Sequence, residues 1–141
     1  MWNYYNGTQK EEMDRLVQEF NDTVGLEQKI VVESVSKGSV SELEDAVRDS
    51  TDGKTGSDPL PDFCPAYADA AYDLWKKNKI SDFRPYLTDE EYDSYISGYL
   101  EEGNFGTNAA MMIFPVAKST EVLTLNSTAW EPFASETGAS L

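Results

Sequence analysis

Apolar positions along the chain fall into short runs separated by stripes at helical spacing. The short runs predict strands near residues 2–5, 30–35, 62–64 and 111–115. A Ser or Thr followed three residues later by Glu is a capping box, which predicts helix starts at Thr8, Ser39 and Thr88. A fourth helix is expected from about Tyr67 to Asn78. This order predicts an α/β fold class, with a parallel-type sheet flanked by helices.

Each predicted helix carries an apolar stripe that is expected to face the core. In the first helix the stripe consists of Met13, Leu16, Val17 and Phe20. In the helix that starts at Thr88 it consists of Tyr92, Tyr95, Ile96 and Tyr99. Thr128 and Glu131 predict a last short helix that carries Trp130 and Phe133.

Two apolar runs, residues 111–116 and 122–125, flank a polar turn at residues 117–121. Pro115 has no N–H to donate, so the first strand ends or reaches a sheet edge there. In the second run, Leu123 and Leu125 would share one face of a strand. Two strands joined by a polar segment are one way in which a chain passes from one lobe to another.

The charge and the cysteine and histidine content limit the chemistry. The chain has 141 residues and a net charge of −15, which opposes binding to nucleic acid and disfavours an anionic ligand. Solubility alone also explains such a charge. There is no histidine and only Cys64, which we expect to be a small buried hydrophobe. We therefore expect no metal, no cofactor and no internal disulfide.

An enzyme remains an alternative interpretation. The 26 acidic residues make a carboxylate pair for glycoside hydrolysis easy to imagine, but no motif selects a pair. The sequence has no Ser-His-Asp set, phosphate loop or metal-ligand spacing, so we assign no catalytic residue. A small acidic α/β hydrolase and a surface interaction module without a small ligand both stay open as alternatives.

The segment FPVAKSTEVLTLN resembles the first hinge crossing of the extracellular solute-binding proteins of ABC transporters. The resemblance is to their sugar-binding family, of the periplasmic-binding-protein-like type II. It rests on Phe114-Pro115, Ser119-Thr120, Leu123 and Asn126. WNYYNG near the start, LPDFCPAYADAAYDLWKKNKISDFRPYL and the helix opening Thr-Asp-Glu-Glu appear in the family's order. Leu125 stands where relatives often carry an aromatic residue.

The resemblance implies that residues 1–117 are an incomplete N-terminal α/β lobe. Residues 118–141 would be the hinge crossing and the start of the second lobe. The whole protein would capture a sugar or oligosaccharide outside the cell and deliver it to the membrane permease of an ABC transporter. It would be a bacterial extracellular protein, a cell-surface lipoprotein or periplasmic, whose signal and anchor lie outside this chain.

The resemblance also implies that this chain is about the first third of a family member. The second lobe and the strand that returns from it would then be absent. We expect such a fragment to bind sugar weakly or not at all, and to self-associate through an unpaired sheet edge.

Ligands of open parallel sheets bind at the carboxyl ends of the strands. The resemblance adds weight to seven residues near those ends: Tyr5, Asn6, Tyr67, Asp69, Lys118, Ser119 and Glu121. Each also has a structural interpretation. Tyr5 fits a core position, Asn6 a turn, and Asp69 the first turn of a helix. Lys118 and Glu121 fit an exposed ion pair. Ala66 stands where some relatives have a stacking aromatic residue.

Overall fold

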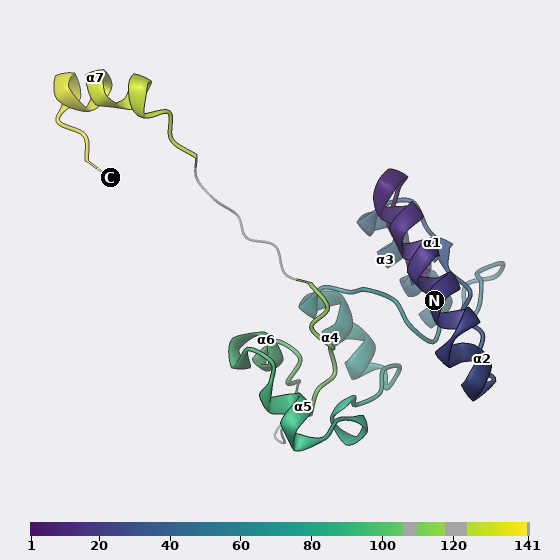
Figure 1. Ribbon diagram of the computed structural model, residues 1–141. Helices are drawn as coiled ribbons and strands as arrows, with labels where there is room; N and C mark the ends of the chain where they lie inside the picture. The colour runs from purple at the N-terminus through teal and green to yellow at the C-terminus, as the bar shows by residue number, and fades with distance from the viewer. Residues whose placement is uncertain (106–109, 118–123, 141) are drawn as a thin grey trace.

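The computed structural model describes residues 1–105, 110–117 and 124–140 (Figure 1). Its strands are β1 (Trp2–Asn3) and β2 (Val35–Ser36). Its helices are α1 (Gly7–Asp22), α2 (Val24–Gln28), α3 (Val40–Thr51), α4 (Ala68–Lys76), α5 (Asp89–Asp93), α6 (Ser97–Glu101) and α7 (Ser127–Thr137), with a 3-10 turn at Arg84–Tyr86. Over the described residues the fold is mixed α/β and mostly helical, and its sheet has two strands.

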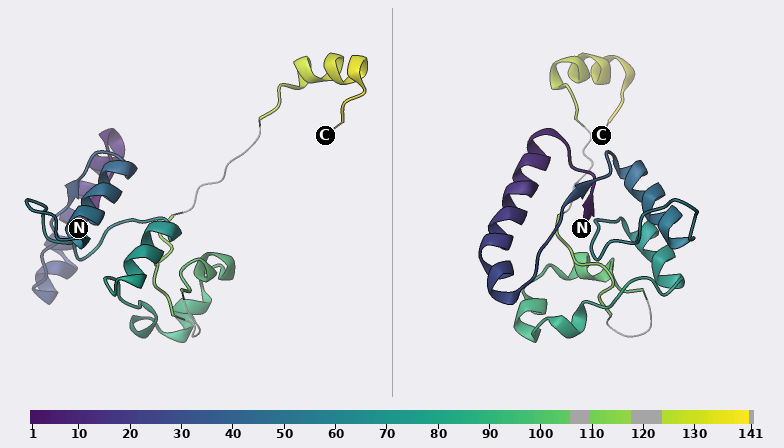
Figure 2. Two further views of the ribbon diagram at one scale, coloured as in Figure 1. Left: turned by 180° about the vertical axis from the view of Figure 1, so that it is seen from behind. Right: turned by 90° about the vertical axis from the view of Figure 1, so that its right-hand side faces the viewer.

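The two strands are parallel and are joined through α1 and α2. Trp2 lies opposite Val35, and Asn3 lies opposite Ser36. The right-hand view of Figure 2 shows α1 and α3 on opposite sides of the strands. Beyond β1, the Trp2 N–H donates to the Phe63 carbonyl at 2.9 Å. The segment at 62–64 therefore lies beside β1, but it makes no ladder and is not a strand.

The strand predicted at residues 30–35 is mostly absent, because only Val35 belongs to β2. Asn21 takes the place of a neighbouring strand beside Val32. Its Nδ2 donates to the Val32 carbonyl at 2.9 Å, and its Oδ1 accepts from the Val32 N–H at 2.8 Å. Val31 is exposed rather than buried. The prediction of a long buried strand is wrong because β1 is only two residues long and offers no further partner.

The strand predicted at residues 111–115 is also absent. The Met111 N–H donates to Asp82 Oδ1 at 2.8 Å, and the Met111 carbonyl accepts from the Phe83 N–H at 2.9 Å. The Met112 N–H donates to the Gly103 carbonyl at 2.8 Å. Hydrogen bonds to loops and to the Asp82 side chain thus satisfy backbone groups that would bond to a neighbouring strand in a sheet. Met111 is nevertheless buried, as the apolar run predicts.

The capping-box predictions have different outcomes. Thr88 forms both bonds of the box with Glu91 at the start of α5. Ser39 caps α3, with its side chain accepting from the Glu42 N–H at 3.2 Å. Thr8 caps nothing, because α1 begins at Gly7 with Asn6 at the N-cap position. The last helix begins at Ser127 and is capped by Asn126, two residues before the predicted cap at Thr128.

The helix predicted from Thr88 is broken in two. The Ser94 hydroxyl donates to the Glu91 carbonyl at 2.6 Å, which closes the last turn of α5. Ile96 then adopts an extended backbone and becomes the N-cap residue of α6. The stripe predicted over Tyr92 to Tyr99 is therefore shared between two short helices and does not form one apolar face.

The main core joins β1, α3 and α4. Its buried members are Trp2, Leu43, Val47 and Leu74. Cys64 packs against this cluster and is half-buried, in keeping with its expected role as a small hydrophobe. By contrast, α1 buries none of its residues, and Leu16 of its predicted stripe is exposed. The helix packs instead against α2, which follows it directly.

The helix α7 stands apart from the other helices in every view (Figures 1 and 2). Asn126 caps it by accepting from the Thr128 N–H at 3.1 Å. Trp130 and Phe133 pack together with their ring centroids 5.6 Å apart. These two rings give α7 its apolar side, as the sequence predicts.

Candidate functional site

The loop that follows β1 is held by polar side chains from both strands. Asn3 is buried, and its Nδ2 donates to the Ser34 hydroxyl at 2.9 Å. Its Oδ1 accepts from the Tyr5 N–H at 3.0 Å. The Ser36 hydroxyl donates to the Tyr5 carbonyl at 2.9 Å. The backbone of Tyr5 is therefore fixed from two sides at the carboxyl end of the sheet.

Asn6 has a structural role in this loop. Its Nδ2 donates to the Tyr4 carbonyl at 3.1 Å and also to the Gly38 carbonyl, which ties the ends of β1 and β2 together. Gly38 has a φ of +98°, and a Cβ there would lie 2.4 Å from the Glu42 carboxylate, so the position favours glycine. The turn interpretation of Asn6 agrees with these contacts.

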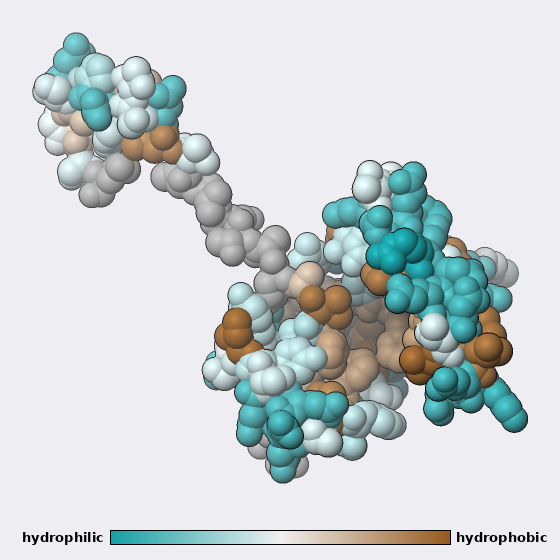
Figure 3. Space-filling view, in the orientation of Figure 1, coloured by the Kyte–Doolittle hydropathy of each residue, from teal (hydrophilic) through white to brown (hydrophobic). Residues whose placement is uncertain are grey.

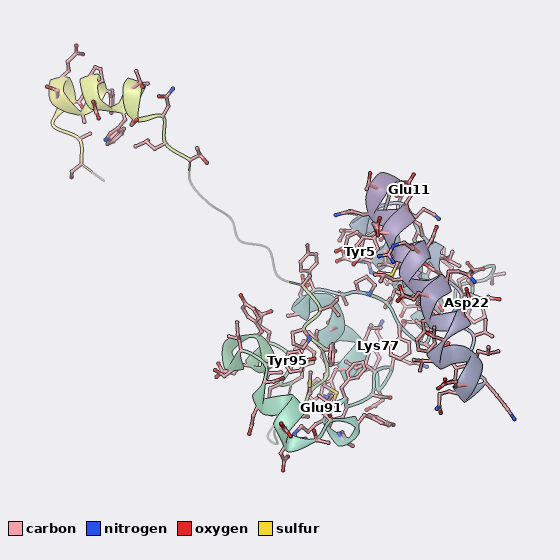
Figure 4. The ribbon with its side chains drawn as sticks, viewed as in Figure 1. Tyr5, Glu11, Asp22, Lys77, Glu91 and Tyr95 are labelled. Atoms are coloured by element: carbon pink, nitrogen blue, oxygen red, sulfur yellow. The ribbon has the colours of Figure 1, made fainter. Side chains whose placement is uncertain are left out.

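Three tyrosines, Tyr4, Tyr5 and Tyr67, form what we call the tyrosine cluster. The Tyr4 and Tyr5 ring centroids are 5.0 Å apart, with the rings tilted by 53°. Burial raises the pKa of Tyr4, and charge repulsion from Tyr5 and Tyr67 raises it further, so both phenols are within electrostatic reach of Tyr4. Figure 4 labels Tyr5 beside α1. The cluster combines exposed ring surface with hydroxyl groups.

Sequence reasoning finds Tyr5 and Tyr67 but misses Tyr4. Tyr67 occupies the N-cap position of α4, and its side chain makes no capping bond. Tyr5 is half-buried rather than a full core residue. The sequence signal for Tyr4 is its position beside Tyr5. Both residues directly follow β1, which is only two residues long.

Asp69 lines a different surface. Its Oδ1 accepts from the Ala70 N–H at 2.9 Å in the first turn of α4, as the helix-start interpretation expects. It borders a cavity of about 240 Å³ between α3 and α4, whose apolar lining includes Leu43, Val47 and Cys64. Burial raises the pKa of the Cys64 thiol, which keeps it protonated and unreactive at neutral pH.

Three further candidates, Lys118, Ser119 and Glu121, lie outside the described residues. The part of the chain that the structure describes holds no group of three or more His, Cys, Asp or Glu side chains suited to a metal ion. Within the same residues, no helix has the length and apolar character that a membrane crossing requires.

Comparison with known proteins gives no identification: no family model matches the chain, and no curated protein matches it either.

Proposed function

We propose that this chain forms part of the sugar-binding cleft of an extracellular solute-binding protein that serves an ABC importer. The tyrosine cluster at the carboxyl end of β1 is the observation that carries the proposal. Tyr5 and Tyr67, which are 62 positions apart in the sequence, are both within electrostatic reach of Tyr4, and Asn6 directly follows Tyr5. The hinge-like segment at residues 114–126 and the order of the other motifs support the same family.

The chemistry of the cluster suits a neutral sugar. A sugar ring has apolar faces that stack on tyrosine rings, and hydroxyls that bond to phenols and fixed backbone groups. The Tyr5 backbone is already held by two hydrogen bonds, so ligand binding loses no conformational entropy in ordering it. The net charge of −15 favours a neutral ligand over an anionic one.

The finer architecture is part of the proposal. The parallel unit of β1, α1 and β2 supports an incomplete N-terminal α/β lobe over residues 1–117. The separation of α7 from the other helices supports assigning residues 118–141 to a hinge crossing and the start of a second lobe. Capture followed by delivery to a permease makes and breaks no covalent bond, so the proposed protein is not an enzyme. Because the solute is captured outside the cell, the proposed protein is extracellular.

A titration of the isotope-labelled chain with neutral mono- and oligosaccharides, followed by NMR, tests this proposal. We expect millimolar sugar to shift the amide signals of residues 4–7 and 66–69. Tyr67→Ala removes a ring that is 56% exposed and should abolish the shifts. Tyr86 lies outside the tyrosine cluster and is 81% exposed, so Tyr86→Ala should leave the shifts unchanged. If the shifts persist in Tyr67→Ala, or if both variants lose them alike, the cluster is not a sugar site.

A further inference from the structure

The region from residue 85 to residue 117 has an unusual charge pattern. It contains no Lys or Arg, yet it carries six acidic residues: Asp89, Glu90, Glu91, Asp93, Glu101 and Glu102. A long segment without positive charge cannot neutralise its acids internally. Its surface therefore favours positively charged groups from outside the segment.

A cavity of about 220 Å³ lies between α5 and α6 in this region. Ring and apolar surface comes from Tyr92, Tyr95 and Leu100, and carboxylates come from Asp93 and Glu101. Figure 3 shows hydrophilic residues gathered over α5 and an apolar patch over α6, and Figure 4 labels Tyr95 in the same region. Among the described residues, neither Asp93 nor Glu101 forms an ion pair with a Lys or Arg.

The chain itself shows how this surface receives a guanidinium group. The Arg84 guanidinium carbon lies 4.5 Å from the centroid of the Tyr92 ring. Arg84 also pairs with Asp89 and donates to the Leu87 carbonyl at 3.0 Å. Ring stacking and carboxylate pairing by one arginine thus already occur beside the cavity. Within the part of the chain that the structure describes, Asp93 and Glu101 have no such arginine partner.

We propose that this cavity is a docking site for an arginine side chain presented by a protein partner. The guanidinium would lie against the Tyr92 and Tyr95 rings and pair with Asp93 and Glu101, and its stem would cover Leu100. The planar guanidinium suits this combination better than an ammonium group, because it stacks on rings and bonds carboxylates at the same time. The proposal is independent of the sugar site, since the two surfaces share no residue.

The surroundings of the cavity are suited to a protein rather than to a small cation. Ile96 is 65% exposed and Tyr99 is also exposed, so apolar surface borders the charged site. Tyrosine and arginine are the residues that most often anchor protein interfaces, and surrounding apolar contacts exclude water from such an anchor. The negative field of the whole chain would also speed association with a basic partner.

The test uses the whole 141-residue chain and a capped peptide, Gly-Ser-Arg-Ser-Gly, followed by NMR. We expect shifts confined to residues 92–104, and none with a peptide that carries Gln in place of Arg. The double variant Asp93→Asn, Glu101→Gln should weaken binding about fivefold, as expected for two exposed ion pairs. The matched variant Glu11→Gln, Glu27→Gln removes the same charge from α1 and α2 and should have little effect.

Three outcomes would overturn the proposal. Equal loss of binding in the two double variants would mean that only net charge attracts the peptide. Absence of shifts at residues 92–104 with millimolar peptide would mean that the cavity does not take arginine. Displacement of the peptide by millimolar calcium, with the same residues shifted, would make the cavity a cation site. Because Asp93 and Glu101 are exposed, the Asn and Gln substitutions should preserve the fold, which the NMR spectrum of each variant checks directly.

Discussion

The region from β1 to α4 and the region from residue 84 to residue 117 are stabilised in different ways. The first has a core in which Trp2, Leu43 and Leu74 come together from three distant elements. The second contains two helices of five residues each, α5 and α6. It relies on caps, on close backbone approach and on ring contacts such as Tyr95 with Phe114, whose centroids are 5.3 Å apart. A cluster of buried apolar side chains stabilises the first region, whereas caps, a close backbone contact and ring contacts stabilise the second.

The two regions also differ in how they treat charge. In the first, acidic residues pair with nearby bases: Lys77 lies 2.6 Å from Asp52, and Lys37 lies 2.8 Å from Asp58. The second has only Arg84 at its edge. This difference teaches that the net charge of −15 is not spread evenly, because residues 85–117 carry six acidic residues and no Lys or Arg.

The largest expected effect comes from the core. Leu43→Ala removes a side chain that is only 2% exposed and should lower the free energy of unfolding by about 2–5 kcal/mol. Leu16→Ala in α1, where the leucine is 51% exposed, should change it by no more than about 0.5 kcal/mol. Urea denaturation followed by circular dichroism measures both. Similar losses in the two variants would show that the core cluster does not distinguish the first region.

The next effect concerns backbone contact in the second region. A Cβ at Gly103 would lie 2.8 Å from the Ile113 carbonyl oxygen and 3.0 Å from the Ile113 nitrogen, so Gly103→Ala should cost about 1–3 kcal/mol. At Gly98, in α6, a Cβ would meet nothing within 4 Å. Gly98→Ala should therefore stabilise the protein by about 0.5–1 kcal/mol. The same denaturation experiment checks the opposite signs, and a stable Gly103→Ala variant would contradict the close approach.

A smaller effect concerns the caps. Thr88→Ala removes the capping box of α5 and should cost about 1 kcal/mol. Thr8→Ala is the control, because Thr8 lies within α1 and caps nothing. Thermal unfolding should separate the two variants. If they lose the same stability, then the box seen at Thr88 contributes no more than an ordinary helix position.

The contribution of the Thr88–Glu91 capping box to stability depends on pH. Bonds from the Thr88 backbone and hydroxyl lower the pKa of Glu91, because they stabilise its carboxylate. A lowered pKa in the folded state means that the contribution to stability is present at neutral pH and is lost as pH falls through the folded-state pKa. An NMR titration of the Glu91 side chain should show a pKa that is less lowered in Thr88→Ala, because the variant loses the hydroxyl bond and keeps the backbone N–H donor. An unchanged, still lowered pKa in that variant would contradict this cause.

Much of the helical structure and part of the candidate site could be predicted. The starts at Ser39 and Thr88 follow from local capping signals, and the predicted α4 is nearly correct at Ala68–Lys76. Tyr5 and Tyr67 were expected near the carboxyl ends of strands, and both are within electrostatic reach of Tyr4. Asp69 instead borders the cavity between α3 and α4, because it lies two residues after Tyr67 and its side chain therefore points to a different side of the helix.

The sequence by itself determined the caps at Ser39 and Thr88, because their bonds join residues three positions apart, although the same pattern at Thr8 forms no cap. It also determined which short runs are apolar. Only the tertiary structure decided which of these runs became strands, because a strand needs a partner from elsewhere in the chain. The Val32 N–H donates to the Asn21 side chain, and the Met111 N–H donates to the Asp82 side chain. No local sequence pattern reveals either bond. The tyrosine cluster has the same origin, since Tyr67 comes within electrostatic reach of Tyr4 only because α4 and β1 share one core.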